Sequence, residues 1–189
     1  GVDWIRTVKA VITFGKAGGG STLTQQLIKN LTGENGKTVS RKFYEILNAL
    51  NLEKHASKST ILEAYMNTVY MSHGCYGVKT TAEKYFGKDL SELNIAECAS
   101  IAAITQNPST NDQLLHPEAN RKRQLTCLYN MLNEGYISQE EYDEAVAYEM
   151  IFTNSENYVK KDNGDTKTEN KAAVNTEIQS YYVDYVIQA

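Results

Sequence analysis

Five charged residues in the first quarter of the sequence have the types and spacing of an anion-binding site. Lys29 and Lys37 precede Arg41 and Lys42, and Glu45 follows one helical turn after Arg41. The whole chain has a net charge of −4, so four cations near one carboxylate are a local concentration of positive charge. The spacing predicts a pocket for a strongly anionic group. It fits equally well a solvated helix face with an ordinary Arg–Glu pair, which would contribute a few tenths of a kcal/mol.

A glycine-rich segment leads into the helix expected to carry Lys29. The sequence GKAGGGSTLTQQLIKNL, residues 15–31, changes abruptly from glycines to an amphipathic pattern. Free backbone N–H groups and the positive end of the helix dipole would allow an anion to bind beside residues 18–22. The alternative is an ordinary surface loop. The segment lacks the Gly-Lys-Ser/Thr ending of a nucleotide-binding P-loop and follows no convincing strand, so we reject that assignment.

The composition is that of an ordinary folded domain. The chain has 189 residues, of which 41% are hydrophobic and 22% charged. Because there is no general excess of basic residues, we expect no nucleic acid partner. No apolar run approaches the roughly 20 residues that span a bilayer, and the opening GVDWIRTVKA lacks a start methionine and a signal-peptide core. We expect the chain to be a fragment of a longer protein.

Helical periodicity on both sides of Pro108 and Pro117 predicts an all-α fold. The helix after the glycines and the helix at 39–55 should each bury an apolar stripe, and Ser40 should cap the second. The two stripes are Leu23, Leu27 and Leu31, and Phe43, Leu47 and Leu50.

Further helices are expected in the remainder of the chain. Thr60 and Glu63 read as a capping box for a helix that ends near His73 and Gly74, and a central buried helix should run from about Ser91 to Asn107. A helix within 119–136 and a short helix capped by Ser138 and Glu141 should follow. The expected buried residues are Ile61, Tyr65 and Val69 in the first of these helices and Leu125, Leu128 and Leu132 in the third, which should stop at Gly135.

The three cysteines, Cys75, Cys98 and Cys127, are widely spaced and include no Cys-x-x-Cys pair. We interpret them as small buried hydrophobic residues rather than as metal ligands or disulfide partners. From about residue 154 to 179 the sequence is polar and typical of a solvated linker, and YYVDYVIQA at 181–189 reads as a strand or short helix leading into a further domain.

Several long motifs together resemble one protein family. They are GGGSTLTQQLIKNL, then RKFYE at 41–45, then KSTILEAYMNTVYMSHGCYGVKTTAEKYFGK at 58–88. Their order and spacing resemble the family 51 glycosyltransferases, the peptidoglycan polymerases of class A penicillin-binding proteins, over about residues 1–150. The resemblance implies a lysozyme-like helical lobe with a smaller membrane-touching jaw. It also implies a reaction in which glycan strands are elongated from lipid II with inversion, releasing undecaprenyl pyrophosphate.

The resemblance implies a role for each residue that matches a family motif. Glu45 matches the second of two functional glutamates, which would organise the cations or a divalent ion such as Mg or Mn near the diphosphate. Lys29, Arg41 and Lys42 match phosphate-binding cations, and Lys37 stands where many members have arginine. The polar groups expected near the substrate are Ser21, Thr22, Gln25 and Gln26, and Asn67 and Gly74 match the sugar-contacting fourth motif.

Other readings remain open for several of these residues. Asn67 would also suit a buried backbone partner, and Gln25 an exposed helix position. We expect packing rather than sugar stacking from the aromatic residues Tyr65, Tyr76, Tyr85 and Phe86. We do not propose His73 as a metal ligand, because no Cys or His lies at ligand spacing, and we expect His55 and His116 at the surface.

The resemblance also defines a domain plan. Residues 1–153 should form the glycosyltransferase domain, with the jaw within about 1–40, and 154–189 should connect to a C-terminal transpeptidase domain. The glutamate that would act as catalytic base should lie just before Gly1, so we expect residues 1–189 alone to be inactive. The full protein should be anchored by an N-terminal transmembrane helix on the outer face of the bacterial cell membrane.

The jaw segment has an apolar face of its own among basic residues, formed by Trp4, Ile5, Val8, Val11, Ile12 and Phe14. This pattern suits a helix at a membrane surface, although a helix packed on the main lobe would read the same way.

Two other functions are compatible with parts of the sequence. A lytic enzyme that cleaves the same glycan would need a carboxylic acid in apolar surroundings, whereas Glu45 stands among cations that favour its ionised form. A non-catalytic module that binds lipid-linked diphosphates, or a helical scaffold, would need no base.

Overall fold

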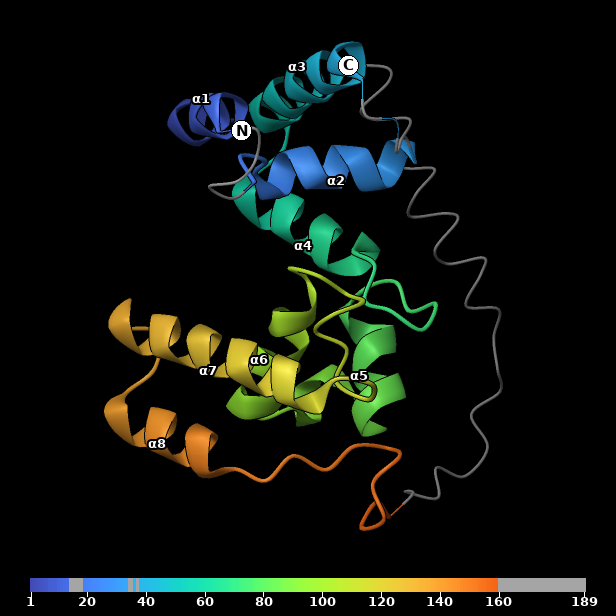
Figure 1. The fold of residues 1–189 in the computed structure, drawn as a ribbon, viewed down its shortest axis with the longest axis vertical. Coiled ribbons are helices and arrows are strands. Elements are labelled where there is room, and N and C mark those ends of the chain that lie inside the picture. The colour runs from blue at the N-terminus through green and yellow to red at the C-terminus, as the bar shows by residue number, and fades with distance from the viewer. Residues whose placement is uncertain (14–18, 34–35, 37, 160–189) are drawn as a thin grey trace. The chain divides into compact units, whose positions relative to one another are not determined.

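The computed structural model describes residues 1–13, 19–33, 36 and 38–159, and within these ranges the chain contains helices and no strand (Figure 1). The predicted all-α class is therefore confirmed. The described residues form two compact units, 1–68 and 69–159. The first unit contains α1 (Trp4–Ile12), α2 (Leu23–Thr32), α3 (Val39–His55) and α4 (Lys58–Thr68). The second contains α5 (Val78–Phe86), the 3₁₀ helix η1 (Leu90–Glu92), α6 (Ile95–Ile104), α7 (Pro117–Asn133) and α8 (Gln139–Ala147).

In the first unit, α2 packs against both α3 and α4. Leu27 and Ile28 of α2 are buried, as are Ile61 and Tyr65 of α4. The burial predicted for Ile61, Tyr65 and Val69 is therefore confirmed, although Val69 lies just after the end of α4. Burial raises the pKa of the Tyr65 hydroxyl, which donates a hydrogen bond of 3.3 Å to Gln26 Oε1. The core of this unit therefore keeps α2 fixed on α4 by apolar packing and by one polar contact.

The apolar stripe predicted for α3 is wrong. Phe43 and Leu47 are 59% and 45% exposed, and the residues that α3 buries are instead Glu45, Ala49 and Leu52. This alternative face follows the same helical period, but it turns the Glu45 carboxylate inward on the same side as Ala49. The first leucine of the α2 stripe, Leu23, is also exposed.

Two helix starts differ from the sequence prediction because another hydroxyl acts as the cap. The Oγ1 of Thr38, not Ser40, accepts the N–H of Arg41 at 3.3 Å and begins α3. In α4 the Oγ of Ser57 accepts the N–H of Thr60 at 3.1 Å, so the helix begins at Lys58. It ends at Thr68, before His73, and an antiparallel bridge between Tyr70 and Tyr76 follows.

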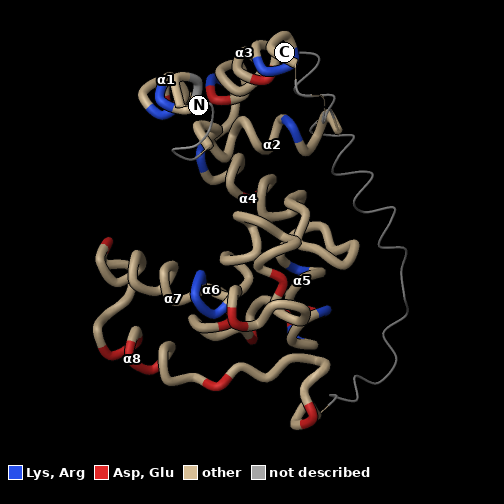
Figure 2. The backbone as a smooth tube through the Cα atoms, viewed as in Figure 1, with Lys and Arg blue, Asp and Glu red and all other residues tan. Residues whose placement is uncertain are grey.

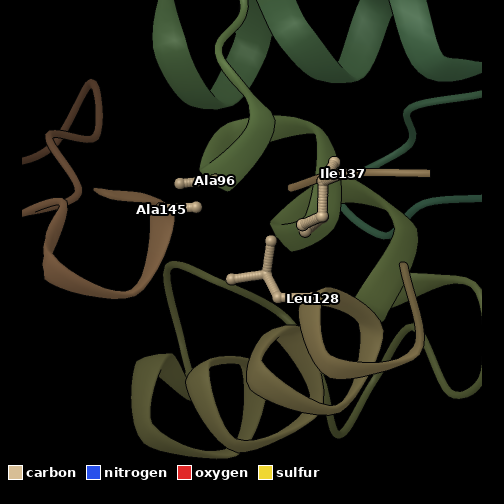
Figure 3. Packing of buried hydrophobic residues seen from close by; sticks show 5 residues of the cluster. Ala96, Leu128, Ile137 and Ala145 are labelled. Carbon is tan, nitrogen blue, oxygen red and sulfur yellow. The ribbon is translucent and has the colours of Figure 1, made fainter. Parts of the chain in front are cut away.

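The second unit is built around α6, which packs against α5, α7 and α8. Alanines on α6 allow the neighbouring helices to approach closely, and Figure 3 shows Ala96 next to Ala145 in a cluster that also contains Leu128 and Ile137. The central buried helix is thus confirmed, although it starts at Ile95, capped by Asn94, and Ser91 belongs to the separate η1. The box of Ser138 and Glu141 at the start of α8 is confirmed.

Polar side chains also cross the interface between α6 and α7. Asn120 accepts a 2.6 Å hydrogen bond from Ser100 Oγ, and Gln124 donates one of 2.6 Å to the Ala96 carbonyl. Each of these amides is buried and paired, so the interface between the two helices has one specific register.

The buried Glu97 carboxylate on α6 accepts a 2.6 Å bond from Lys88 Nζ. Burial acts to lower the pKa of Lys88, but the hydrogen bond and charge of Glu97 outweigh it and raise that pKa. This pair holds the segment between α5 and α6 on the body of the unit.

The predictions for α7 and for the cysteines are only partly correct. Leu128 is fully buried, whereas Leu125 and Leu132 are half-buried. Cys75 is buried as expected, but Cys98 is exposed, because its side of α6 faces solvent. None of the three cysteines forms a disulfide.

Candidate functional site

The centre of the predicted site is a buried carboxylate held between two cations at the start of α3. Glu45 is 5% exposed, and its Oε2 accepts a 2.7 Å hydrogen bond from Nη1 of Arg41. The other oxygen, Oε1, pairs with Nζ of Lys42. Both cations lie one turn before Glu45 on the same helix, so the helix itself sets their spacing. The carboxylate therefore holds the two cationic side chains in fixed positions.

A pocket of about 190 Å³ opens beside this cluster, between α2 and α3. Lys29 lines it together with Arg41 and Glu45. The remaining lining residues are Ile28 and Thr32 of α2, with Tyr44 and Asn48 of α3. Three cations and one carboxylate leave a local charge of +2, which favours an anion in the pocket. The structure thus brings together Lys29, Arg41, Lys42 and Glu45, as the spacing predicted.

The N-terminus of α2 meets the same cluster through Ser21, whose Oγ accepts a 2.7 Å hydrogen bond from Nζ of Lys42. Thr22 caps the helix, and its Oγ1 accepts the N–H of Gln25 at 3.3 Å. In the reciprocal hydrogen bond, the Oε1 of Gln25 accepts the N–H of Thr22 at 2.9 Å. This reciprocal box fixes the approach of Ser21 to the cations.

Gln25 is fully buried, so its reading as an exposed helix residue is wrong. Its Nε2 is a buried donor with no hydrogen-bond partner within the part of the chain that the structure describes. Gln26 is half-buried and accepts the Tyr65 hydroxyl. The sequence did not predict the burial of Gln25 or the contact between Gln26 and Tyr65, because both depend on how α2 is rotated against α4.

The glycines before α2 have a packing role that the sequence did not indicate. A Cβ at Gly20 would lie 2.8 Å from the Thr7 Cα and 2.9 Å from the Arg6 carbonyl oxygen, both backbone atoms of α1. At Gly19 a Cβ would meet nothing within 4 Å. Gly20 therefore allows α1 to lie directly against the segment that carries Ser21.

The fourth motif lies apart in the sequence and spans the division between the two units. Asn67 is half-buried near the end of α4. Gly74, in the second unit, is exposed with φ +74, and a Cβ there would meet nothing within 4 Å. Position 74 thus favours glycine because of its left-handed backbone and not because another group lies close to it.

Of the aromatic residues expected to pack, Tyr65, Tyr85 and Phe86 are buried, but Tyr76 is 49% exposed.

Lys37 lies outside the described residues, so its position stays a prediction. His55 and His116 are exposed as expected. His73 pairs with a carboxylate, Asp112, at 3.0 Å. No group of three His, Cys, Asp or Glu side chains suited to a metal ion occurs among the residues described.

The donors around the pocket do not fit a divalent cation. Among the residues that the structure describes, Glu45 is the one acidic side chain that lines it, and both of its oxygens already accept from cations. Oxygen ligands with negative charge are what Mg²⁺ and Mn²⁺ require. We therefore assign no step of the chemistry to a metal held by these residues.

The chain matches known proteins over the same region. Residues 1–132 match the family model described as Transglycosylase. The chain is 44% identical over 131 residues to penicillin-binding protein 1F of Bacillus subtilis, covering 69% of this chain and 18% of that protein. It is 42% identical over 150 residues to penicillin-binding protein 1A of Aquifex aeolicus, covering 77% and 21%.

A shorter relative and a solved structure give the same result. A putative transglycosylase of Cupriavidus necator is 40% identical over 149 residues, covering 77% of this chain and 64% of that protein. The crystal structure of penicillin-binding protein 1A from Haemophilus influenzae superposes with a TM-score of 0.50 at 28% identity, covering 70% and 17%. The chain spans about a fifth of the length of the penicillin-binding proteins it matches. From the family match over residues 1–132, the chain belongs to the transglycosylase family, as a domain of the kind found in penicillin-binding proteins.

Proposed function

We propose that this domain polymerises lipid II into glycan strands by transferring the growing chain from its lipid diphosphate to the 4-hydroxyl of the next lipid II sugar. The observation that carries the proposal is the Arg41–Glu45–Lys42 cluster beside the pocket that Lys29 lines. A diphosphate leaving group needs positive charge that is already in position when its bond breaks. This cluster supplies that charge on rigid helical elements.

The bond changes follow from an inverting displacement at the anomeric carbon. The acceptor oxygen forms a bond to this carbon and loses its proton to a base. The bond from the carbon to the diphosphate oxygen breaks, and its electron pair stays on the diphosphate. Lys29, Arg41 and Lys42 would stabilise that new charge.

Glu45 is not suited to be the base, because both of its oxygens accept hydrogen bonds from cations. Its role in the proposal is to hold Arg41 and Lys42 in place. The base would come from the family's first motif, which should precede Gly1. We therefore predict that a polypeptide of residues 1–189 alone makes no polymer, and that adding the preceding native segment restores synthesis.

The same contacts argue against a glycan-cleaving enzyme of the lysozyme type. Such an enzyme needs a protonated carboxylic acid beside the glycosidic oxygen. Glu45 is instead paired with the Arg41 guanidinium and the Lys42 ammonium, so it lacks the apolar surroundings that such an acid requires. Incubating purified glycan strands with the full-length protein should yield no shortened products.

Association with a membrane surface is part of the proposal, since the substrate is a lipid. Helix α1 exposes Trp4, Ile5, Val8 and Ile12, with exposed fractions of 57%, 84%, 54% and 71%. Residues 1–68 carry nine Lys and Arg against five Asp and Glu, whereas residues 69–189 carry ten against eighteen. Figure 2 shows basic residues on α1, α2 and α3 and acidic residues along α8. An exposed apolar face in a positively charged unit suits an anionic lipid surface.

None of the helices in the described ranges is long and apolar enough to cross a bilayer. An N-terminal anchor preceding this chain remains part of the proposal, as does a C-terminal transpeptidase domain.

The test is glycan synthesis from lipid II by the full-length protein and its Glu45→Gln and Arg41→Ala variants. We expect the kcat of both variants to fall about 100-fold or more, as on removing a preorganised transition-state contact. Lys54→Ala, an exposed cation at the end of the same helix, is the matched control and should retain full activity. Full polymerisation by Arg41→Ala would refute the proposed role of the cluster, and no polymer from the wild type would refute the function.

A further inference from the structure

The loop between α4 and α5 contains three successive residues with left-handed backbone. Ser72, His73 and Gly74 have φ values of +74°, +47° and +74°. Residues other than glycine rarely adopt this region, and two in succession store strain unless surrounding contacts compensate for it. The loop is closed by the bridge between Tyr70 and Tyr76 and by a 2.8 Å bond from the Cys75 N–H to the Ser72 carbonyl.

The buried carboxylate of Asp112 contacts the side chains of both Ser72 and His73. Its Oδ2 lies 3.0 Å from Nε2 of His73 and accepts a 3.1 Å hydrogen bond from the Tyr85 hydroxyl. The Ser72 side chain also hydrogen-bonds to Asp112. Asp112 comes from the segment between α6 and α7, about 40 residues further along the chain, and its side chain has no exposed surface.

The other carboxylate oxygen fixes Asp112 to its own segment. Oδ1 accepts the N–H groups of Leu114 and Leu115 at 2.9 and 3.0 Å. Burial acts to raise the pKa of Asp112, but the bonds from Ser72, Leu115 and Leu114 outweigh it and lower that pKa. The Asp112 carboxylate is therefore held in place by its own segment and is charged. It can accept hydrogen bonds from Ser72 and His73 and so stabilise their left-handed backbone.

His73 connects this buried contact to the surface. Its side chain is 30% exposed, and its ring lies against Tyr85 with centroids 6.0 Å apart. The contact with a carboxylate requires a hydrogen on Nε2, which sets the orientation of the ring. Loss of Asp112 would free His73 and Ser72 together, and with them the conformation of Gly74.

We propose that Asp112 is a positioning residue for the transglycosylation reaction, because it holds loop 70–77 in the conformation that binds the sugar of the substrate. The inference rests on the proposed function and on the resemblance of the motif containing Asn67 and Gly74 to a sugar-contacting motif. Nothing in the sequence motifs pointed to Asp112, since none of the motifs quoted above includes it. A purely structural role would instead make any loss of activity follow a loss of folding stability.

Two variants separate these roles in the full-length protein with lipid II as substrate. In Asp112→Asn, one amide oxygen keeps the two backbone bonds, but an NH₂ group replaces the acceptor for His73 and Tyr85. In His73→Gly, the contact is lost while the left-handed backbone becomes unstrained, so the melting temperature should not fall. For both variants we expect the KM for lipid II to rise about 10-fold, with kcat within about 2-fold of wild type.

The controls are Asp143→Asn, an exposed carboxylate on α8, and His116→Gly, at a helix start where glycine is tolerated. Both should keep the wild-type KM. A wild-type KM in His73→Gly, or a KM that rises only with a falling melting temperature, overturns the inference while the wild type still polymerises. If Asp112→Asn does not fold, His73→Gly decides alone. If the wild type makes no polymer, the proposed function fails and this inference fails with it.

Discussion

Replacing Gly20 by alanine should separate α1 from the segment that carries Ser21. The added Cβ would lie 2.8 Å from the Thr7 Cα, whereas ordinary contacts begin at 3.4 Å, so the two backbones must move apart by about 0.6 Å. Neither atom belongs to a flexible side chain, and overpacking of this kind costs about 1–3 kcal/mol. For a domain of this size we expect the melting temperature to fall by about 2–12 °C.

Gly19→Ala is the matched control, because its Cβ would meet nothing within 4 Å. It should leave the melting temperature unchanged or raise it slightly through a less flexible unfolded chain. Thermal unfolding of both variants, followed by circular dichroism in the same buffer, gives the comparison. Equal melting temperatures for Gly20→Ala and Gly19→Ala would show that the close approach of α1 is incorrect.

Three further predictions concern the second unit and the exposed face of α1. Glu97→Ala leaves the Lys88 ammonium without its buried partner and should cost about 3–5 kcal/mol in urea unfolding, whereas a loss below 1 kcal/mol would contradict a buried pair. The lowered pKa of Asp112 contributes stability that is present above its unfolded value near 3.8 and is lost as the pH falls through its folded pKa. Asp112→Asn should therefore make the unfolding free energy depend less on pH in the acidic range. An unchanged pH dependence would contradict the lowered pKa of Asp112. Changing Trp4 and Ile5 to serine should weaken flotation with anionic vesicles, and equal flotation would argue that α1 does not bind lipid.

The sequence predicted the helices well where polar and apolar positions alternate with a clear period. Ile61 and Tyr65 are buried as expected, and the Ser138 box begins α8. The starts of α3 and α4 were misplaced because several hydroxyls stand close together at each start, and only the backbone geometry decides which one caps. Local spacing limits such predictions to within a few residues.

The face of α3 was the main error, and its cause is physical. Phe43 and Leu47 satisfy an apolar period, but Glu45, Ala49 and Leu52 satisfy a helical period too, and they are the residues buried. A carboxylate can be buried here because Arg41 and Lys42 of the same helix neutralise it. The buried face of α3 thus includes a charged residue paired within its own helix, which a count of apolar residues overlooks.

The candidate site was predictable in part. The spacing of Arg41, Lys42 and Glu45 on one helix was enough to expect their contact. The contact of Ser21 with Lys42 was not, because it depends on how α2 packs on α3. Asp112 carried no local signal, since its partners His73 and Tyr85 are distant in sequence.

Binding of a prenyl diphosphate tests the central claim most directly, because it needs neither the base nor turnover. The dissociation constant would be measured by calorimetry in detergent for the full-length wild type, Arg41→Ala and the exposed-cation control Lys79→Ala. A charge-assisted hydrogen bond contributes about 1.5–3 kcal/mol, so Arg41→Ala should bind about 10- to 150-fold more weakly. The control should bind within about 2-fold of wild type, as expected for a cation outside the pocket. Equal affinity of Arg41→Ala and wild type would contradict the assignment of this pocket to the diphosphate.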